Sequence, residues 1–317
     1  MRERLPFEAL VPALRQMFVQ GCETPLRHSH LIEEPDAEPG KPTGTLLLMP
    51  AWRAGAYMGI KAVNIFPGNG VLGLPAVHAA YTLFDARTGQ PLASMDGTEI
   101  TARRTAASAA LAASYLARCD AQNLLVVGAG RVAALLPEAL RAVRPNLRAV
   151  RVWSRNMASA EKLAVQLREH GFAARAAPDL EAAARQAHVI SCATLSNTPL
   201  VQGAWLAPGT HLDLIGSFTP QMREADGACF ARARVFIDTP EALAKSGDVL
   251  TAIAEACFAT GQLQATLAEL CQGLKPGRRS ADDITLFKSV GTALADLAAA
   301  ELVWSGADNP ATSLLPA

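Results

Sequence analysis

A short glycine motif between an apolar run and a helical pattern constrains the fold of this chain more than any other feature. Residues 124–127 read LLVV, and Gly128-Ala-Gly130-Arg-Val-Ala133 follows directly. A second apolar run begins about 20 residues after the motif, which gives the order strand, GxGxxA, helix, strand. Glycine permits a tight turn at Gly128, and at Gly130 it leaves the backbone open to a pyrophosphate at the helix N-terminus. The motif in this context predicts a dinucleotide-binding fold.

Further strand-like runs follow this motif and alternate with helical patterns or turn signals. They are residues 150–153, 188–192, 211–215 and 234–238. This alternation predicts an α/β fold with a Rossmann-type, doubly wound parallel sheet. We expect this dinucleotide-binding domain to occupy residues 119–284.

The segment before this domain has a different pattern. Short apolar runs separated by turn signals predict an antiparallel or mixed sheet over residues 59–95. Helical spacing predicts a first helix that ends near Val19 and an alanine-rich helix over 98–117, capped near Thr98 or Thr101. An insertion-like loop is expected at about 33–44.

The last apolar segment is expected to return to the first domain. Residues 284–304 begin like a strand and continue as a long apolar helix. The first domain is therefore predicted to be a discontinuous α+β unit of residues 1–118 and 285–317.

Composition excludes several classes of function. The chain has 317 residues, no formal net charge, 50% hydrophobic residues and 5% aromatic residues. It lacks the basic surplus and the aromatic content typical of nucleic-acid binding. No apolar stretch reaches the roughly 18–20 residues that span a bilayer, and the charged N-terminus does not resemble a secretory signal. We expect a cytoplasmic protein with no nucleic-acid or membrane partner.

Metal-binding signals are weak. The six cysteines are scattered without a CxxC pair. His28 and His30 precede the acidic residues Glu33, Glu34 and Asp36, but a solvated acidic loop explains this run, so we expect no metal. Asp213 is interpreted as a structural hydrogen-bond acceptor and Cys192 as a small buried thiol.

The choice of dinucleotide depends on the residues after the second strand. An Asp or Glu at this position accepts from the ribose hydroxyls of NAD and repels a 2′-phosphate. Here the chain reads Trp153-Ser154-Arg155-Asn156, and these hydroxyl, guanidinium and amide groups are good phosphate donors. This pattern favours NADP(H), with NAD(H) as a second possibility. The alternative is that Arg155 is a solvated residue at the start of a helix.

Three cations lie outside ordinary surface contexts. Arg27 follows Thr24-Pro-Leu, Lys61 lies within an apolar strand, and Arg104 lies in a helix of small residues. A buried cation needs an anion, and no acidic cluster is near any of them in the sequence. A substrate carboxylate could be that anion.

Several runs together resemble the ornithine cyclodeaminase/mu-crystallin family. They are Gly73-Leu-Pro-Ala-Val-His78, Asp96-Gly-Thr-Glu-Ile-Thr-Ala-Arg-Arg-Thr-Ala-Ala107, the Gly128 motif, Lys245-Ser-Gly-Asp248 and Thr285-Leu-Phe-Lys-Ser-Val-Gly291. The resemblance covers nearly the whole chain in order. It implies a homodimer in which the first domain carries the substrate and dimer contacts and the second binds the nicotinamide cofactor.

The resemblance also implies roles for individual residues. Arg27, Lys61 and Arg104 are expected to hold the α-carboxylate of the substrate, with Lys61 and Arg104 as the catalytic pair. The expected cofactor contacts are Thr105, Gly128, Gly130, Arg131, Val132, Ser154, Arg155, Asn156, Ala193, Thr194, Leu195, Lys288 and Gly291.

Two departures from the family pattern argue against ornithine deamination. Phe218, in Gly216-Ser-Phe-Thr-Pro220, occupies the position of the catalytic Asp of the cyclodeaminases, and the glutamate that faces the ornithine amine is replaced near Leu47. The run around Phe218 instead resembles the branch that reduces cyclic ketimines. An apolar Phe218 beside a ring suits a methylene-rich substrate.

The leading hypothesis is NADPH-dependent reduction of Δ1-pyrroline-2-carboxylate or Δ1-piperideine-2-carboxylate to L-proline or L-pipecolate, in proline metabolism or lysine degradation. The three cations would orient this cyclic imino acid while hydride adds to the imine carbon. The imine can collect its proton from solvent. Otherwise Lys61 is the first candidate donor and His78 the second, although His78 could instead be a packed core or interface histidine. The alternatives are an ornithine cyclodeaminase, an alanine or N-alkyl amino acid dehydrogenase, and a non-catalytic, crystallin-like binder of NADPH and a ligand.

Overall fold

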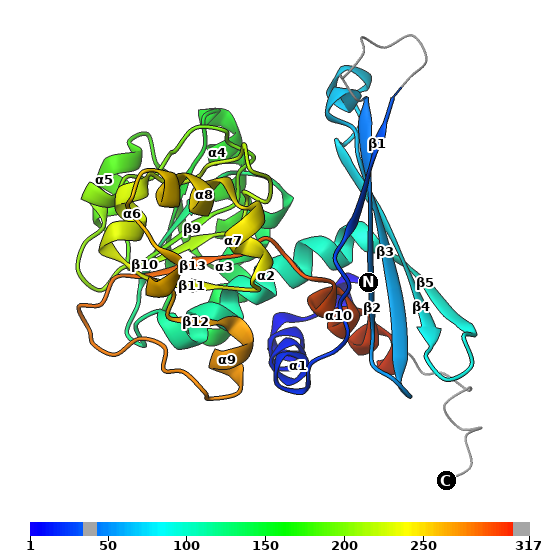
Figure 1. Cartoon of the computed structure of the whole chain (residues 1–317). Helices are drawn as coiled ribbons and strands as arrows, with labels where there is room; N and C mark the ends of the chain where they lie inside the picture. Colours follow the sequence, from blue (N-terminus) through cyan, green and yellow to red (C-terminus); the bar gives the residue numbers. More distant parts are fainter. Residues whose placement is uncertain (34–42, 307–317) are drawn as a thin grey trace. The chain divides into compact units, whose positions relative to one another are not determined.

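The computed structural model describes residues 1–33 and 43–306, which divide into two units (Figure 1). The first unit holds Met1–Arg104 together with the chain from Thr292 onwards, and the second holds Thr105–Gly291. The boundaries thus fall at 104/105 and 291/292, whereas the sequence placed them at 118/119 and 284/285. The loop expected at about 33–44 lies almost entirely outside the described residues. Within residues 1–33 and 43–306, every helix is too short or too polar to span a membrane.

An eight-stranded parallel sheet forms the second unit, in the order β12-β11-β13-β10-β9-β6-β7-β8. Its strands are β6 (Asn123–Val127), β7 (Ala149–Trp153), β8 (Ala173–Ala176), β9 (Val189–Cys192), β10 (His211–Leu214), β11 (Arg234–Ile237), β12 (Ala265–Thr266) and β13 (Thr285–Lys288). From β6 the chain runs outward to β7 and β8 and then crosses to β9 on the other side. Ligands of doubly wound folds bind at such a reversal of strand order. The predicted Rossmann-type α/β class is confirmed.

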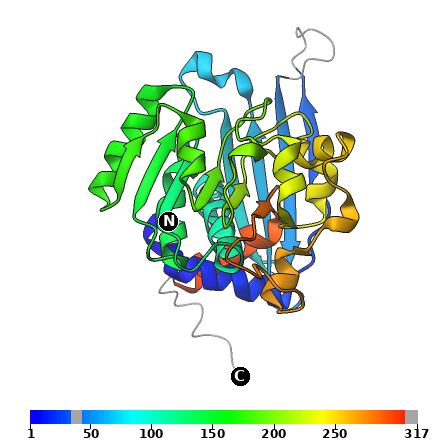
Figure 2. The same cartoon turned by 90° about the vertical axis from the view of Figure 1, so that its left-hand side faces the viewer.

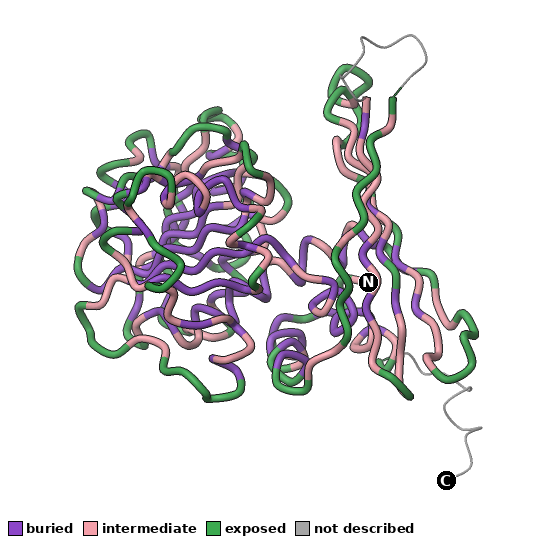
Figure 3. The backbone as a smooth tube through the Cα atoms, in the orientation of Figure 1, coloured by how far each residue is buried: buried purple, intermediate pink, exposed green. Residues whose placement is uncertain are grey.

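Helices flank this sheet on both sides (Figures 1 and 2). They are α3 (Arg131–Val143), α4 (Met157–Glu169), α5 (Leu180–Arg185), α6 (Gly227–Arg232), α7 (Glu241–Lys245), α8 (Gly247–Ala254) and α9 (Leu267–Cys271), with short 3-10 turns η3 (Gly203–Trp205) and η4 (Thr260–Gln262). The strands form the buried centre of the unit (Figure 3). Leu124, Leu125, Val126 and Val127 are each no more than 1% exposed, as expected of a strand covered on both faces.

Three strands of this sheet correct the sequence prediction. The segment from 285 was expected to belong to the first domain, but β13 lies between β10 and β11 in the second unit. β8 and β12 were missed, because β8 consists of alanines and one arginine and β12 of two residues. Short strands of this composition have no period-2 pattern that distinguishes them from helix or loop.

A five-stranded antiparallel sheet forms the first unit, in the order β1-β2-β3-β4-β5, and confirms the predicted α+β pattern. The elements are η1 (Arg2–Arg4), α1 (Phe7–Gln20), β1 (His28–Ile32), β2 (Gly44–Trp52), β3 (Tyr57–Ile65), η2 (Pro67–Leu72), β4 (Val77–Asp85), β5 (Pro91–Asp96) and α10 (Ala293–Ser305). α10 packs on β2, β3 and β4, and α1 packs on α10. Small buried alanines in α10 permit this close approach.

The long helix α2 (Gly97–Leu116) starts one residue before its predicted range and has a different cap. Asp96 Oδ1 accepts from the backbone N–H groups of Thr98 at 2.9 Å and Glu99 at 3.0 Å. Asp96 therefore caps the helix, whereas the sequence pointed to Thr98 or Thr101. An Asp at this position satisfies two of the N–H groups that a helix start leaves without intrahelical partners.

Candidate active site

Lys61 lies in the middle of the first unit's sheet, on the face that α10 covers. Antiparallel pairing places it opposite Met49 on β2 and Tyr81 on β4. Its side chain is only 1% exposed. A cation at such a position needs an anion close by.

Asp296, in the first turn of α10, is that anion. Its Oδ2 lies 2.6 Å from Lys61 Nζ, and its Oδ1 accepts from Arg104 Nε at 2.8 Å. Asp296 is fully buried. Asp296 is 192 residues from Arg104, so this acidic partner is not evident from sequence spacing. The available signal was one charged residue in the otherwise apolar run 293–300.

The contact with Asp296 uses only one of the three guanidinium nitrogens of Arg104. Nε is its donor to Asp296, and no acceptor among the described residues binds its two terminal amino groups. Lys61 and Arg104 therefore share one carboxylate and keep N–H groups for a further anion. The neighbouring Arg103 differs, since it donates to Glu99 at 3.1 Å and to the carbonyl of Leu5 at 2.9 Å.

Electrostatics in this cluster act in opposite directions on Lys61. The pKa of Lys61 is lowered to about 7, mainly by burial and also by the charges of Arg104 and Arg27, although the carboxylate of Asp296 raises it. Arg27, half-buried just before β1, is thus near enough to Lys61 to act on its ionisation. The structure brings the three predicted cations together and adds an acid to them.

His78 does not join this cluster. It lies on β4 opposite Asn64, three residues before Tyr81, and is exposed. Side chains alternate between the two faces of a strand, so His78 points to the face opposite Lys61 and Tyr81. Within one chain this geometry does not support a substrate contact shared by His78 and Lys61. His78 is not a packed core residue, and its alternative role as an interface histidine stays a prediction.

The glycine motif of the second unit has the backbone it needs. Gly128 has φ +119°, and a Cβ there would lie 2.6 Å from the carbonyl oxygen of Ala193. At Gly130, by contrast, a Cβ would meet no atom within 4 Å in the described structure. Gly130 precedes α3, whose first turn has no side-chain cap in the described chain, and Arg131 and Val132 begin that helix. The arrangement fits a pyrophosphate at this helix start.

The residues that follow β7 differ in role: Asn156 caps a helix, whereas Ser154 and Arg155 are available to a ligand. Asn156 Oδ1 caps α4, accepting from the N–H groups of Ala158 at 3.0 Å and Ser159 at 3.3 Å. Its oxygen is therefore structural, and only its NH2 remains for a phosphate. Arg155 is exposed and has no ion-pair or hydrogen-bond partner within the described residues, and Ser154 is half-buried beside it. Both fit a phosphate-binding position.

A buried glutamate that no sequence motif singled out joins two loops at the ends of β9 and β10. Glu224 accepts from Thr194 N–H at 2.7 Å, Thr194 Oγ1 at 2.9 Å and Gly216 N–H at 2.8 Å. Burial raises the pKa of Glu224 to about 7. The contact fixes the predicted cofactor loop, in which Ala193 is half-buried and Leu195 is 61% exposed.

Lys288 corrects a second prediction. Its side chain is fully buried, and Nζ donates to Ser217 Oγ at 2.9 Å and to Asp248 Oδ2 at 3.1 Å. With no exposed surface it cannot contact a cofactor. Asp248 also accepts from the N–H of Glu224 at 2.7 Å. Lys288 is therefore part of the buried hydrogen-bond network that holds Ser217 and Glu224.

Another buried acid, Asp238, binds the last residues of the second unit through hydrogen bonds. Asp238 Oδ2 accepts from Ser289 Oγ at 2.7 Å and Gly291 N–H at 2.7 Å. Gly291, a predicted cofactor contact, is thus bound through its backbone to Asp238. Phe218 lies half-buried against a small cluster that includes Ile237 and Val290. Asp238, like Glu224 and Asp248, has its partners in other loops, which is why sequence spacing did not reveal it.

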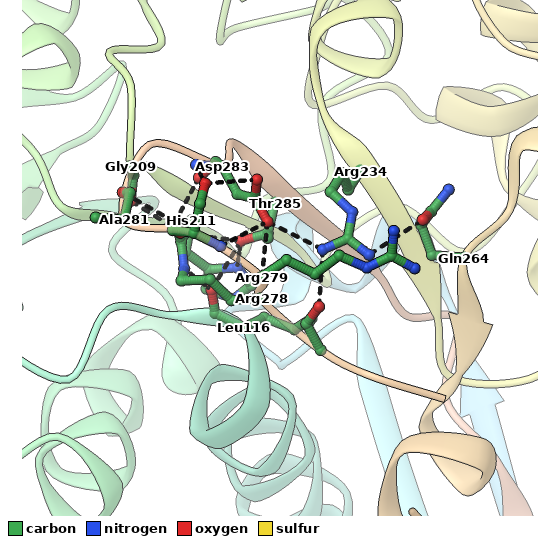
Figure 4. Close-up of polar contacts among 12 residues, drawn as sticks. Leu116, Gly209, His211, Arg234, Gln264, Arg278, Arg279, Ala281, Asp283 and Thr285 are labelled. Carbon is green, nitrogen blue, oxygen red and sulfur yellow. Dashed lines mark hydrogen bonds and ion pairs between the residues drawn. The ribbon is translucent and has the colours of Figure 1, made fainter. Parts of the chain in front are cut away.

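Buried polar groups at the amino ends of the strands have structural partners (Figure 4). Arg278 donates to the carbonyls of Leu116 at 2.7 Å and Gly209 at 3.0 Å and to Thr285 Oγ1 at 3.2 Å. His211 Nδ1 lies 3.0 Å from Thr285 Oγ1. Asp213, fully buried on β10, accepts from Ser191 Oγ, in accord with its reading as a structural acceptor.

Comparison with known proteins agrees with this architecture. Residues 22–309 match the model of the ornithine cyclodeaminase/mu-crystallin family. The chain belongs to this family. It is an NAD(P)H-dependent oxidoreductase that acts on C=N or CH–NH bonds.

Three relatives illustrate the similarity. The chain is 40% identical to Δ1-pyrroline-2-carboxylate reductase of Paracoccus denitrificans, over 88% of this chain and 89% of that one. The structure of the same reductase from Thermococcus litoralis, with NADH and L-proline, has a TM-score of 0.87 at 31% identity and covers 96% of this chain and 95% of its own. An archaeal alanine dehydrogenase dimer with bound NAD has a TM-score of 0.87 at 30% identity, covering 100% of this chain and 96% of its own.

Proposed function

We propose that this protein reduces cyclic ketimines that carry a carboxylate, Δ1-pyrroline-2-carboxylate and Δ1-piperideine-2-carboxylate, to L-proline and L-pipecolate. The observation that carries the proposal is the pairing of Lys61 and Arg104 with one carboxylate, that of Asp296, among the described residues. The donors left over suit the carboxylate of the substrate. The names of the Paracoccus and Thermococcus relatives support the same substrate class.

Two apolar residues, Leu47 in the first unit and Phe218 in the second, favour a ketimine over ornithine as the substrate. Leu47 lies two residues before Met49 on β2 and therefore shares the face of Lys61. Phe218 offers a half-buried ring where the cyclodeaminases have an acid. Neither side chain can transfer a proton, and hydride addition to an already protonated ring imine requires no dedicated acid.

The bound nicotinamide would supply the hydride to the imine carbon. The protein's part is to orient the ring through its carboxylate and to keep positive charge beside it. Lys61, whose pKa is lowered to about 7, is the proton-bearing neighbour in this proposal. Arg27 adds a third positive charge to the same cluster.

NADP(H) is the proposed cofactor. Arg155 is exposed and unpartnered in the described chain, and Trp153 and Ser154 stand where an NAD enzyme carries a carboxylate. The Thermococcus and archaeal relatives are described with NADH and NAD, so the cofactor of this chain needs its own measurement. A cytoplasmic location stays a prediction from the sequence.

The first unit also offers a surface for a homodimer. The sheet face opposite α10 carries Leu48, Ile60, Ala62 and Ala80, and Ile60 is 37% exposed. Exposed apolar side chains on an uncovered sheet face are typical of protein interfaces. The alanine dehydrogenase relative is a dimer.

The test is NADPH and NADH oxidation with each freshly prepared ketimine, followed by chiral identification of the product. We expect turnover with at least one ketimine and a preference for NADPH. Pyruvate with ammonia or methylamine tests the dehydrogenase alternative, and ornithine tests cyclodeamination. Turnover confined to these, or ligand binding with no turnover at all, would refute the proposal.

A further inference from the structure

Asp296 is placed to do more than neutralise charge. Each of its carboxylate oxygens contacts a different cation, Lys61 at 2.6 Å and Arg104 at 2.8 Å. These cations come from β3 and α2, and Asp296 comes from a third element, α10. One fully buried carboxylate therefore fixes the positions of two nitrogen atoms.

We propose that Asp296 is the positioning residue of the anion site: it holds the Lys61 ammonium and the Arg104 guanidinium so that their remaining N–H groups bind one substrate carboxylate. This inference rests on the proposed function, because it names how that site is assembled. Arg104 uses Nε for Asp296, which leaves its two terminal amino groups. A planar guanidinium held at one edge can offer further N–H groups to a second carboxylate.

The location of Asp296 favours its ionised form. It lies in the first turn of α10, where the helix dipole stabilises negative charge. Although burial alone would raise the pKa of Asp296, the charges of Lys61 and Arg104 lower it below its usual value. The residue thus remains an anion that can order both cations before substrate arrives.

The same contact controls the charge of Lys61. The titratable and charged groups that face Lys61 are Asp296 on α10, Arg104 on α2, Arg27 before β1 and Tyr81 on β4. Of these, Asp296 raises the lysine pKa and both arginines lower it. Replacing the Asp296 carboxylate by an amide should lower the pKa of Lys61 further, so that Lys61 loses its ammonium form at a lower pH.

The experiment measures binding of L-proline and L-alanine to the full-length protein in the presence of saturating NADP+, by isothermal titration from about pH 5.5 to about pH 8.5. In the wild-type protein, affinity for at least one probe falls as pH rises through about 7. In Asp296→Asn, we expect affinity at pH 7 to fall at least about tenfold and the decline to begin about one pH unit lower. The activity profile, where there is turnover, should shift in the same direction.

Glu301→Gln is the matched control. Glu301 lies on the same helix and binds Arg53 at 2.6 Å, not Lys61 or Arg104. The Glu301→Gln variant should bind both probes with the wild-type affinity and the wild-type pH dependence. If Asp296→Asn keeps the wild-type affinity and pH profile, or if neither probe binds the wild-type protein, the inference is wrong.

A second variant covers the case in which Asp296→Asn does not fold. Lys61→Met should abolish the decline in probe affinity through about pH 7, because it removes the titrating ammonium. Persistence of that decline would overturn the inference. Failure of the proposed function can be told apart from failure of this inference. If only the proposed function is wrong, ketimines are not turned over, but probe binding still depends on pH as described.

Discussion

At the scale of single residues, the adjacent Arg103 and Arg104 show how surroundings decide a role. Arg103 binds Glu99 and the carbonyl of Leu5, and its guanidinium lies 5.1 Å from the ring centroid of Phe7. Arg104 has one protein acceptor, Asp296, among the described residues. Arg103 is therefore a structural cation, whereas we propose that Arg104 uses its remaining N–H groups to bind the substrate.

Arg104→Ala should remove a charge-assisted contact to the substrate carboxylate. We expect kcat/KM to fall by about 100-fold to 1,000-fold, equal to about 3–4 kcal/mol of transition-state stabilisation. Steady-state kinetics with the ketimine that turns over fastest gives this number. Arg103→Ala is the comparison: it should lower the midpoint of thermal unfolding and change kcat/KM by less than about threefold. A fall of less than tenfold for Arg104→Ala would mean that this residue too is structural.

Arg155→Ala tests the cofactor. Without the guanidinium, we expect kcat/KM for NADPH to fall by about 10-fold to 100-fold, since the 2′-phosphate loses a charged donor, while the value for NADH stays within about twofold. Both are read from initial rates at varied cofactor concentration. Arg151→Ala, at an exposed position on β7, serves as the control. Equal losses with both cofactors would assign Arg155 to some role other than phosphate binding.

At the scale of elements, arginines bind the carboxyl end of α2. Arg144 donates to the carbonyls of Ser114 and Ala117, both at 2.8 Å, and Arg278 donates to that of Leu116 at 2.7 Å. Cations stabilise the carboxyl end of a helix because its last carbonyls lack intrahelical partners. The same arginines lie near His211 on β10, and together with its burial they lower its pKa to about 3.

His211 should therefore make the protein sensitive to acid. In the unfolded chain, His211 becomes protonated as pH falls below about 6.5. In the folded chain, its imidazole stays neutral until about pH 3. Between these values the unfolded state binds more protons, so the group's contribution to stability falls by about 1.4 kcal/mol per pH unit as pH decreases. Urea unfolding at pH 6.5 and at about pH 5 measures the difference.

His211→Gln should flatten this dependence, even if it lowers stability at every pH. His170→Gln, at an exposed position, should leave the slope unchanged. An unaltered slope in His211→Gln would show that His211 does not cause the acid sensitivity.

At the scale of the whole molecule, the chain is two units with different sheets. The parallel sheet of the second unit is buried on both faces, whereas the antiparallel sheet of the first has one face covered by α10. That difference leaves an apolar face around Ile60 without cover in the described chain.

Ile60→Asp should turn a dimer into a monomer, because a charge at an apolar interface loses its hydration without gaining a partner. Light scattering coupled to size exclusion gives the mass directly. Val165→Asp is matched in exposure, with Val165 40% and Ile60 37% exposed, but lies on α4 of the second unit. It should leave the mass unchanged, and a monomeric wild-type protein would contradict the prediction.

Local sequence determined much of this protein. The order of strand, glycine motif and helix around Gly128 fixed the second unit's class, because turn geometry and strand patterning are local properties. Lys61 and Arg104 stood out as cations in apolar surroundings, and burial of both is confirmed. Alternation within β3 and β4 could also have shown that His78 and Lys61 belong to different faces, once their pairing was known.

Tertiary structure alone decided which groups meet. Asp296 lies 192 residues from Arg104, and Glu224 contacts a loop 30 residues away at Thr194. The family resemblance predicts Lys288 as a cofactor contact, whereas its strand lies between β10 and β11 and its ammonium donates to Ser217 and Asp248. The physical reason is that a buried charge is stabilised by whatever lies within a few ångströms of it, and chain distance carries no information about that.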